Sequence, residues 1–382
     1  MKILIIHRSF ALIGGAERVI TEKANYLCQR GHHVMLVSYE QGTHTIPYNL
    51  HDNVQFIDLD CRFFTLSKFS IPMRLFHYFH LKRKLRDALR DLILLKEPDV
   101  VVLASDWQFL IGTVLSAASK VPVIAEFHNA YDFIIKKIGS EGNCLKECLV
   151  RFYYQRSLNS FRRCAQLVVL TENDAKHWRK HSNNVTVIPN PVTQYPEYID
   201  DVAKENGRII CVGRYNGQKR IDRLISAFFL IADKYPDWHV DIFGEGDLKE
   251  KLLQQIKSCN MEKRIILHEP TKNIYDEYKK SQFLVLSSEY EGRPLVLIEA
   301  MSCGTPCVAF DCPSGPKEII DDGITGLLAE NGNVHDLALK MEWLITHDSE
   351  RVEMGKKAHE AAAEYEPSRI MVKWEKFYSN VV

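Results

Sequence analysis

Two glutamates stand close together in a segment that is suited to sugar chemistry. Glu291 and Glu299 are separated by seven residues, and the apolar run Phe283–Leu286 precedes them. The run predicts a buried parallel strand, and Pro294 is suited to open the helix that follows. Glu291 is then expected in a loop at the carboxyl edge of a sheet, where open α/β sheets bind ligands, and Glu299 inside the helix. One carboxylate is suited to sugar hydroxyls and the other to a ribose diol.

Two cations are predicted at the end of another strand. Arg214 follows the predicted strand Arg208–Val212, and Lys219 comes five residues later. Arg offers a bidentate fork and Lys a compact charge, so the pair is suited to a diphosphate, as are the helix amides near Leu295 and Val296. A surface basic cluster explains the two cations equally well. Likewise, two glutamates at this spacing arise by chance, and a helical glutamate is usually solvated.

The residues around these groups resemble the donor-site signature of retaining glycosyltransferases of family 4. The matching segments are Glu291-Gly292, Pro294, Glu299-Ala300-Met301, Gly304-Thr305-Pro306, Gly213-Arg214 with Lys219, and Gly14-Gly15-Ala16-Glu17-Arg18. The resemblance covers nearly the whole chain, densely in residues 207–330 and sparsely in residues 40–120. It implies the GT-B fold, in which two doubly wound Rossmann-like domains face a cleft and a C-terminal helix crosses back to the first domain.

The resemblance also implies roles for individual residues. The implied catalytic residues are His128, Arg214, Lys219 and Glu291, and the implied donor-binding residues are Gly14, Gly15, Arg214, Lys219, Gly244, Pro270, Leu295, Val296 and Glu299. A lone His such as His128 is more commonly a buried structural residue. The chain departs from the family at Arg220, where many relatives have Gly, and near Pro270, which leaves the base of the nucleotide open. Whether Arg293 contacts the donor is also open.

The order of apolar runs predicts two α/β halves. Seven β-branched runs alternate with helical patterns up to residue 188, and five more follow from Arg208, which indicates two parallel doubly wound sheets. The break Pro189-Asn190-Pro191 and the polar stretch after it mark the joint. We therefore expect an acceptor-side domain at 1–192, a donor domain at 193–366, and a last helix, 367–382, that returns to the first domain as the resemblance implies.

Composition fits a soluble globular protein of the cytosol. The chain has 46% hydrophobic and 26% charged residues, and no run approaches the length of a membrane span. Its ten Cys lack paired spacing and are predicted to be reduced and buried. Asp58-Leu59-Asp60 mimics a metal motif of another glycosyltransferase fold but lacks its surroundings. We expect neither a metal nor a cofactor, and no nucleic-acid partner.

A net charge of zero hides two oppositely charged halves. Residues 1–190 hold 25 Lys and Arg against 17 Asp and Glu, so 25 − 17 = +8, and the remainder is 24 − 32 = −8. Basic and aromatic residues interleave in Arg62–Arg90 and Phe133–Arg163. This pattern favours an anionic membrane surface, although packed helices with extended Lys and Arg side chains explain it about as well. The protein is therefore expected at the inner face of the plasma membrane.

The predicted function is retaining, metal-independent glycosyl transfer. The resemblance implies that a hexose or N-acetylhexosamine moves from a nucleotide sugar, in our interpretation a UDP-sugar, to an acceptor hydroxyl. Asp311-Cys-Pro-Ser-Gly-Pro-Lys-Glu318 resembles enzymes of bacterial capsule, O-antigen and exopolysaccharide assembly, which implies a lipid-diphosphate-linked oligosaccharide as acceptor. The alternatives are a nucleotide-sugar 2-epimerase of the same architecture and a catalytically silent binding subunit.

Overall fold

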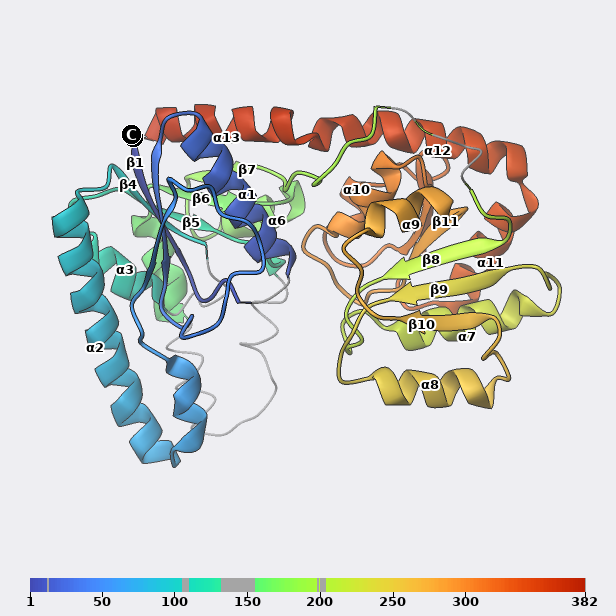
Figure 1. Ribbon diagram of the computed structural model, residues 1–382, viewed down its shortest axis with the longest axis horizontal. Coiled ribbons are helices and arrows are strands. Elements are labelled where there is room, and N and C mark those ends of the chain that lie inside the picture. The colour runs from blue at the N-terminus through green and yellow to red at the C-terminus, as the bar shows by residue number, and fades with distance from the viewer. Residues whose placement is uncertain (12–13, 105–109, 132–154, 198, 200–203, 382) are drawn as a thin grey trace. The chain divides into compact units, whose positions relative to one another are not determined.

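The chain forms two compact units in the computed structural model (Figure 1). The structure describes residues 1–11, 14–104, 110–131, 155–197, 199 and 204–381. Unit 1 comprises Met1–Pro189 with Met371–Val382, and unit 2 comprises Asn190–Ile370. Residues 133–154, which make up most of the stretch Phe133–Arg163, lie outside the described residues.

Unit 1 is built on a seven-stranded sheet in the order β3-β2-β1-β4-β5-β6-β7, with every neighbouring pair parallel. Its strands are β1 (Lys2–His7), β2 (His33–Ser38), β3 (Gln55–Asp58), β4 (Val100–Leu103), β5 (Val123–Glu126), β6 (Gln166–Val169) and β7 (Val185–Val187). Its described helices are α1 (Gly15–Gln29), η1 (Phe63–Lys68), α2 (Ile71–Lys96), α3 (Ile111–Ala117), η3 (Phe161–Arg163) and α6 (Glu172–Trp178).

Unit 2 is built on a six-stranded sheet in the order β10-β9-β8-β11-β12-β13, again parallel throughout. Its strands are β8 (Arg208–Val212), β9 (His239–Phe243), β10 (Ile265–His268), β11 (Phe283–Leu286), β12 (Cys307–Phe310) and β13 (Gly326–Ala329). Its described helices are α7 (Ile221–Ala232), α8 (Lys249–Ser258), α9 (Ile274–Lys280), α10 (Leu295–Ser302), η5 (Pro316–Glu318), α11 (Val334–Thr346), α12 (Asp348–Ala362) and η6 (Ala363–Tyr365). The last helix, α13 (Pro367–Val381), begins in unit 2 and has most of its residues in unit 1.

Strand β11 shows why the sheet of unit 2 is covered on both faces. Phe283 and Val285 belong to the hydrophobic cluster formed with α7, α8 and α11, whereas Leu284 and Leu286 belong to the cluster formed with α9, α10 and α12. All four residues are buried, as expected for a parallel strand that has helices on both of its sides. The sequence-based prediction of a buried strand before Glu291 is confirmed.

The predicted doubly wound α/β architecture is confirmed in both halves, with one strand missed. Gly326–Ala329 was not predicted, yet it forms β13 at the edge of the second sheet. Its four residues, Gly-Leu-Leu-Ala, contain no β-branched or aromatic side chain, and such residues carry most of the sequence signal for strands. Among the described residues, no helix is both long and apolar enough to cross a membrane.

Candidate functional site

Lys219 and Glu291 meet at one edge of the sheet in unit 2. Strands β8 and β11 are parallel neighbours, so the loops that follow them leave the sheet at the same edge. Lys219 Nζ lies 2.6 Å from Oε1 of Glu291, and the side chains of Lys219 and Glu291 are 19% and 7% exposed. The sequence predicted both residues at strand ends, and the topology brings them into contact.

Hydrogen bonds tie the two loops together. The amide of Glu289 donates to the carbonyl of Gln218 at 2.9 Å, and the side-chain amide of Gln218 donates to the carbonyl of Tyr290 at 3.1 Å. The hydroxyl of Ser287 donates to the carbonyl of Lys219 at 3.0 Å. These bonds fix the loops relative to each other, so the Lys219–Glu291 pair has a set position before any ligand arrives.

Arg214 is the exposed cation of this group. It lies two residues after the end of β8, and its side chain makes no hydrogen bond or ion pair with any other described residue. Gly213 lets Lys219 pass close by, since a Cβ at Gly213 would lie 3.3 Å from three methylene carbons of Lys219. A Cβ at Gly244 would clash with the carbonyl oxygen of Gly213, so the close approach of the two loops accounts for Gly244. Together these residues place a free guanidinium and a positioned ammonium in the loop after β8, which suits a diphosphate.

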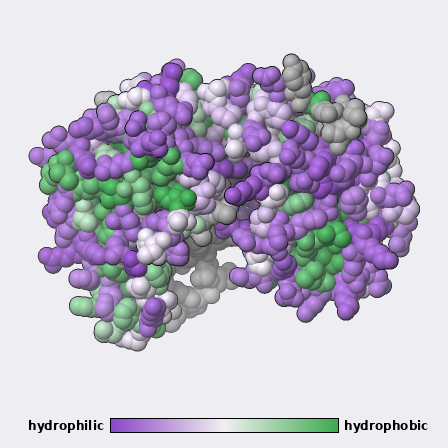
Figure 2. All heavy atoms as spheres, viewed as in Figure 1, coloured by the Kyte–Doolittle hydropathy of each residue, from purple (hydrophilic) through white to green (hydrophobic). Residues whose placement is uncertain are grey.

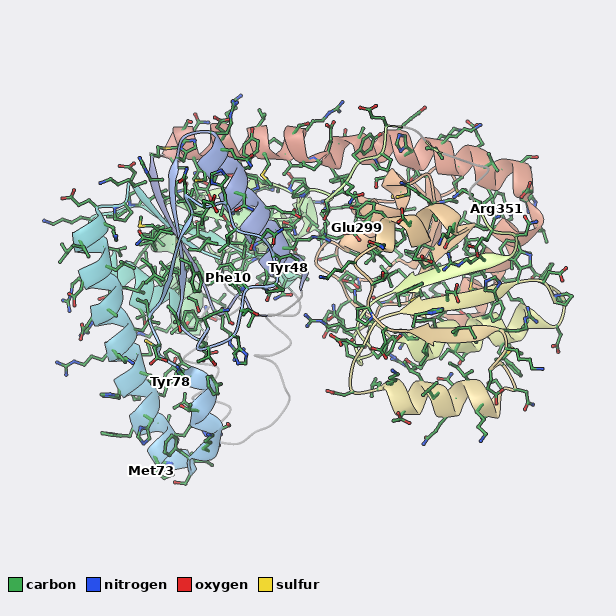
Figure 3. All side chains as sticks on the ribbon, in the orientation of Figure 1. Phe10, Tyr48, Met73, Tyr78, Glu299 and Arg351 are labelled. Atoms are coloured by element: carbon green, nitrogen blue, oxygen red, sulfur yellow. The ribbon has the colours of Figure 1, made fainter. Side chains whose placement is uncertain are left out.

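Glu299 lies inside α10 and is buried. Its Oε2 accepts a hydrogen bond from the hydroxyl of Tyr278 at 3.1 Å, and the residue is 4% exposed (Figure 3). Pro294 caps the helix in an extended conformation, and Leu295 and Val296 form its first turn. The amides of a first turn have no acceptor within the helix, so they remain suited to an anion. The predicted helix position of Glu299 is therefore confirmed, while its proposed ribose contact stays a prediction.

The contacts of Arg220 account for an arginine at a position where many relatives have glycine. Its backbone is left-handed, with φ 45° and ψ 44°, which is the conformation that favours glycine. Its guanidinium forms ion pairs with Asp222 at 2.9 Å and with Glu289 at 3.2 Å. Those ion pairs raise the pKa of Arg220, the hydrogen bonds to Asp222 most strongly. The side chain thus gains partners that offset part of the backbone strain, and one of them, Glu289, belongs to the loop that carries Glu291.

Arg293 points into the packing of unit 2. Its guanidinium lies 4.9 Å from the ring centroid of Tyr365 and donates a hydrogen bond to the Tyr365 hydroxyl. Its Nη1 lies 3.7 Å from Oε2 of Glu318, and the side chain is 7% exposed. These contacts assign Arg293 a structural role between the loop after β11 and the segments around Glu318 and Tyr365.

Pro270 is not brought to the group around Lys219 and Glu291. It is exposed and follows β10, the edge strand that β9 separates from β8. Strand β10 is also the one that holds His268, whose Nε2 lies 2.8 Å from Oδ1 of Asp241. A contact between Pro270 and a nucleotide base stays a prediction.

In unit 1, Gly14 and Gly15, which the resemblance assigns to the donor, form the start of α1. Gly14 is the N-cap, with an extended backbone, and its carbonyl accepts a hydrogen bond from the hydroxyl of Tyr48 at 3.1 Å (Figure 3). Gly15 is the first helical residue and is exposed. The two residues before Gly14 lie outside the described residues. The helix start is thus accessible and anchored by Tyr48.

His128 lies beside a buried ion pair. It follows β5, and its Nε2 is 3.6 Å from Oε2 of Glu126. Both ring nitrogens are buried, and neither has a hydrogen-bond partner among the described residues. Glu126 also contacts Lys23 of α1, whose Nζ lies 2.6 Å from Oε2 of Glu126. Buried polar atoms without partners are rare, so a hydroxyl group of a ligand would suit His128.

The Lys23–Glu126 pair is closed off by the C-terminal helix. Trp374 of α13 lies over the ammonium of Lys23, 3.9 Å from ring centroid to Nζ, and the hydroxyl of Tyr378 donates to Glu126 at 3.2 Å. Burial lowers the pKa of Lys23 and raises that of Tyr378. Burial alone would also raise the pKa of Glu126, but the charge of Lys23 and contact with His128 outweigh it and hold that pKa at about 2.

Sequence reasoning missed Lys23, Glu126, Trp374 and Tyr378. One signal was available in α1, where Ile20, Lys23, Ala24 and Leu27 share the spacing of a buried helical stripe and all four are fully buried. A lysine inside such a stripe needs a buried anion. The identity of that anion was not visible in the sequence because Glu126 is more than one hundred residues away.

Comparisons with known proteins identify the chain. Residues 13–193 match the family model described as Glycosyltransferase Family 4, and residues 198–361 match the model described as Glycosyl transferases group 1. The chain is a family 4 glycosyltransferase with the GT-B fold. The expected family and the expected fold are thereby confirmed.

Several relatives match over nearly their whole length. An uncharacterized glycosyltransferase of Haemophilus influenzae is 28% identical over 94% of this chain and 95% of that protein. The Campylobacter jejuni GalNAc-alpha-(1->4)-GalNAc-alpha-(1->3)-diNAcBac-PP-undecaprenol alpha-1,4-N-acetyl-D-galactosaminyltransferase is 24% identical over 96% of both chains. Anabaena Alr3699/HepE, solved in complex with UDP-glucose, superposes with a TM-score of 0.74 at 18% identity and covers 100% of both chains. This structural likeness shows the shared fold.

Proposed function

We propose that this glycosyltransferase moves a hexose or N-acetylhexosamine from a UDP-sugar to an acceptor hydroxyl with retention of configuration. The observation that carries the proposal is the Lys219–Glu291 contact at the carboxyl ends of β8 and β11, with the unpartnered guanidinium of Arg214 in the same loop as Lys219. A cation pair for the diphosphate and a carboxylate for sugar hydroxyls are the groups that a nucleotide-sugar donor requires.

The donor would replace the ion pair between Lys219 and Glu291. In the proposed complex the diphosphate binds Lys219, Arg214 and the amides of Leu295 and Val296. Glu291 is then free to accept hydrogen bonds from the sugar hydroxyls. Glu299 holds the ribose diol from inside α10. Arg214 and Lys219 then neutralise the charge that develops on the leaving diphosphate, so the reaction needs no divalent cation. A uridine nucleotide is favoured by the UDP-glucose complex of the Anabaena protein.

The proposed acceptor is an oligosaccharide linked to a lipid diphosphate, in the assembly of a bacterial surface polysaccharide. The name of the Campylobacter relative gives a PP-undecaprenol acceptor of this class. Such an acceptor lies in the membrane, and the first 190 residues carry a net charge of +8 that would attract an anionic surface. We therefore propose that the protein is cytoplasmic and binds peripherally to the inner face of the plasma membrane.

Replacing Glu299 by Ala tests the donor site. A carboxylate on a ribose diol makes charge-assisted hydrogen bonds worth about 1.5–3 kcal/mol, so the affinity for UDP is expected to fall roughly ten- to a hundredfold. Isothermal titration calorimetry measures this directly. Because Glu299 also accepts a hydrogen bond from Tyr278, Tyr278→Phe is the matched control: it removes that bond and keeps the carboxylate. Unchanged UDP affinity in a folded Glu299→Ala protein would contradict the role of Glu299.

A further inference from the structure

The start of α2 exposes large apolar side chains to solvent. Together with Phe64 near the start of η1, it presents a cluster that we call the apolar end of α2. Its members are between 48% and 67% exposed, and they are Phe64, Ile71, Met73, Leu75, Phe76 and Phe79. Figure 3 places Met73 at the free end of the helix, away from the sheet of unit 1, and Figure 2 shows hydrophobic surface interspersed with hydrophilic surface at this end of the helix.

The fully buried residues of α2 all lie in its second half, whereas Tyr78 and Leu81 of the first half are only partly buried against the core of unit 1. The buried residues of α2 are Leu85, Leu89 and Ile93, a single stripe with four-residue spacing, and none of the residues before Leu85 is buried. A helical segment in water is normally polar on its outer face. The first turns of α2 instead carry apolar side chains on several faces. The core of unit 1 therefore does not account for the apolar end of α2.

Local contacts hold this end in place. The guanidinium of Arg74 donates to the carbonyls of Leu66 at 3.1 Å and Phe69 at 3.2 Å, so it joins α2 to η1. The rings of Phe69 and His77 stack at 4.0 Å between centroids. Tyr78 packs inward on the buried ring of Phe63, 6.0 Å between centroids. The exposed side chains thus project from a supported helix start.

Charge decides what kind of partner fits this surface. Residues 61–86 contain seven Lys and Arg and no Asp or Glu, so 7 − 0 = +7. A second copy of the chain that docked through this same surface would bring the same positive charge to the contact and would be repelled. An anionic bilayer attracts the basic side chains with its headgroups and offers hydrocarbon to the apolar ones. Of these two partners, only the bilayer satisfies both features.

We propose that the apolar end of α2 inserts into the acyl region of an anionic bilayer, while the basic residues that follow it bind the headgroups. This inference rests on the proposed membrane contact and goes beyond it, because insertion adds a hydrophobic component that salt does not screen. Interfacial helices of this kind bury their apolar face about 5–10 Å deep.

Co-sedimentation of the full chain with phosphatidylcholine vesicles containing phosphatidylglycerol tests the insertion. Phe76→Ser/Phe79→Ser is expected to lower vesicle partitioning about tenfold or more at high salt, because both rings lose their transfer to hydrocarbon. The matched control is Leu94→Ser/Leu95→Ser at the other end of α2, where the leucines are 71% and 76% exposed. Asp91 and Glu97 flank those leucines, so this control is expected to partition like the wild type.

A charge variant separates insertion from adsorption. Replacing Lys82, Arg83, Lys84 and Arg86 by Gln is expected to weaken binding at low salt and to leave a residual binding that salt does not change. If the charge variant alone loses binding and Phe76→Ser/Phe79→Ser binds like the wild type, the membrane contact stands but insertion is wrong. If the wild type does not bind the anionic vesicles, both the inserted end and the proposed membrane contact are wrong, while UDP binding still tests the transferase function separately.

The depth to which the apolar end of α2 inserts into the bilayer is measured with tryptophan fluorescence. Phe76→Trp is expected to add emission that lipids brominated in the acyl chain quench, whereas Leu94→Trp is expected to add emission that they do not quench. Equal quenching of the two variants would overturn the proposal. So would a dimer of the wild type that Phe76→Ser/Phe79→Ser converts to monomer in analytical ultracentrifugation, because the apolar end would then be covered by a second copy.

Discussion

Replacing Arg214 by Ala is expected to lower kcat about 10²–10³-fold, with a much smaller change in the KM for the donor. The reason is that negative charge builds on the diphosphate as the glycosidic bond breaks, so a cation there stabilises the transition state more than the bound donor. Arg214 is exposed and has no side-chain partner among the described residues, so its removal is expected to change the free energy of unfolding by less than about 0.5 kcal/mol. Steady-state kinetics and thermal denaturation measure the two effects.

Two neighbouring variants show whether the loss is specific. Lys219→Ala is expected to lower kcat similarly, but it also leaves the carboxylate of Glu291 without its partner and therefore lowers stability as well. Arg220→Gln is the matched control, since it removes the ion pairs with Asp222 and Glu289 in the same loop without removing a proposed diphosphate ligand. If Arg214→Ala and Arg220→Gln had equal kcat values, the diphosphate role of Arg214 would be wrong.

Replacing Lys23 by Met is expected to destabilise unit 1 by about 3–5 kcal/mol, because it leaves the carboxylate of Glu126 buried without its counter-charge. The ammonium and the carboxylate are both fully desolvated, and Trp374 and Tyr378 of α13 cover them. Hydrogen exchange measured by mass spectrometry is expected to show the loss of protection first in peptides from β5 and α13. A loss of protection confined to peptides of unit 2 would contradict this role of the Lys23–Glu126 pair in unit 1.

The double variant Lys23→Met/Glu126→Leu keeps this prediction testable if Lys23→Met does not fold. Replacing both partners by apolar residues removes the unpaired charge, so most of the lost stability is expected to return. The pH dependence is a second readout. The folded pKa of Glu126 is about 2, below its usual value of 4.5, so its contribution to stability is present above the usual value and is lost as pH falls toward 2. The double variant is expected to lack this loss.

Much of the fold was predictable because its strands are short, apolar and separated by helical patterns. Phe283–Leu286 has the predicted bounds, since buried parallel strands read as continuous apolar runs. Strand β13 was missed because Gly326–Ala329 lacks β-branched and aromatic residues, and its strand conformation is set by pairing with β12. Tertiary pairing of this kind is not encoded in any local pattern.

A residue of the candidate site was predictable where its position depends only on the strand or helix next to it in the sequence. Arg214, Glu291 and the helix position of Glu299 followed from local patterns and the family resemblance. The Lys219–Glu291 contact required the strand order, which places β8 beside β11 although 70 residues of chain separate them. The left-handed backbone of Arg220 could not be predicted from the sequence, because the path of the folded loop requires it and the residue type does not. Contacts between distant segments are the part that sequence patterns do not contain.

NMR analysis of the sugar released from the donor tests the proposed function most directly. The donor is chosen by thermal shift from a panel of nucleotide sugars, because a ligand that binds only the folded state raises the apparent stability. With water as a slow acceptor and excess chelator, we expect UDP to be released and the free sugar to appear first in the anomeric configuration of the donor. Release of the opposite anomer, dependence on a divalent cation, or conversion of the donor to its 2-epimer without UDP release would each contradict retaining, metal-independent glycosyl transfer.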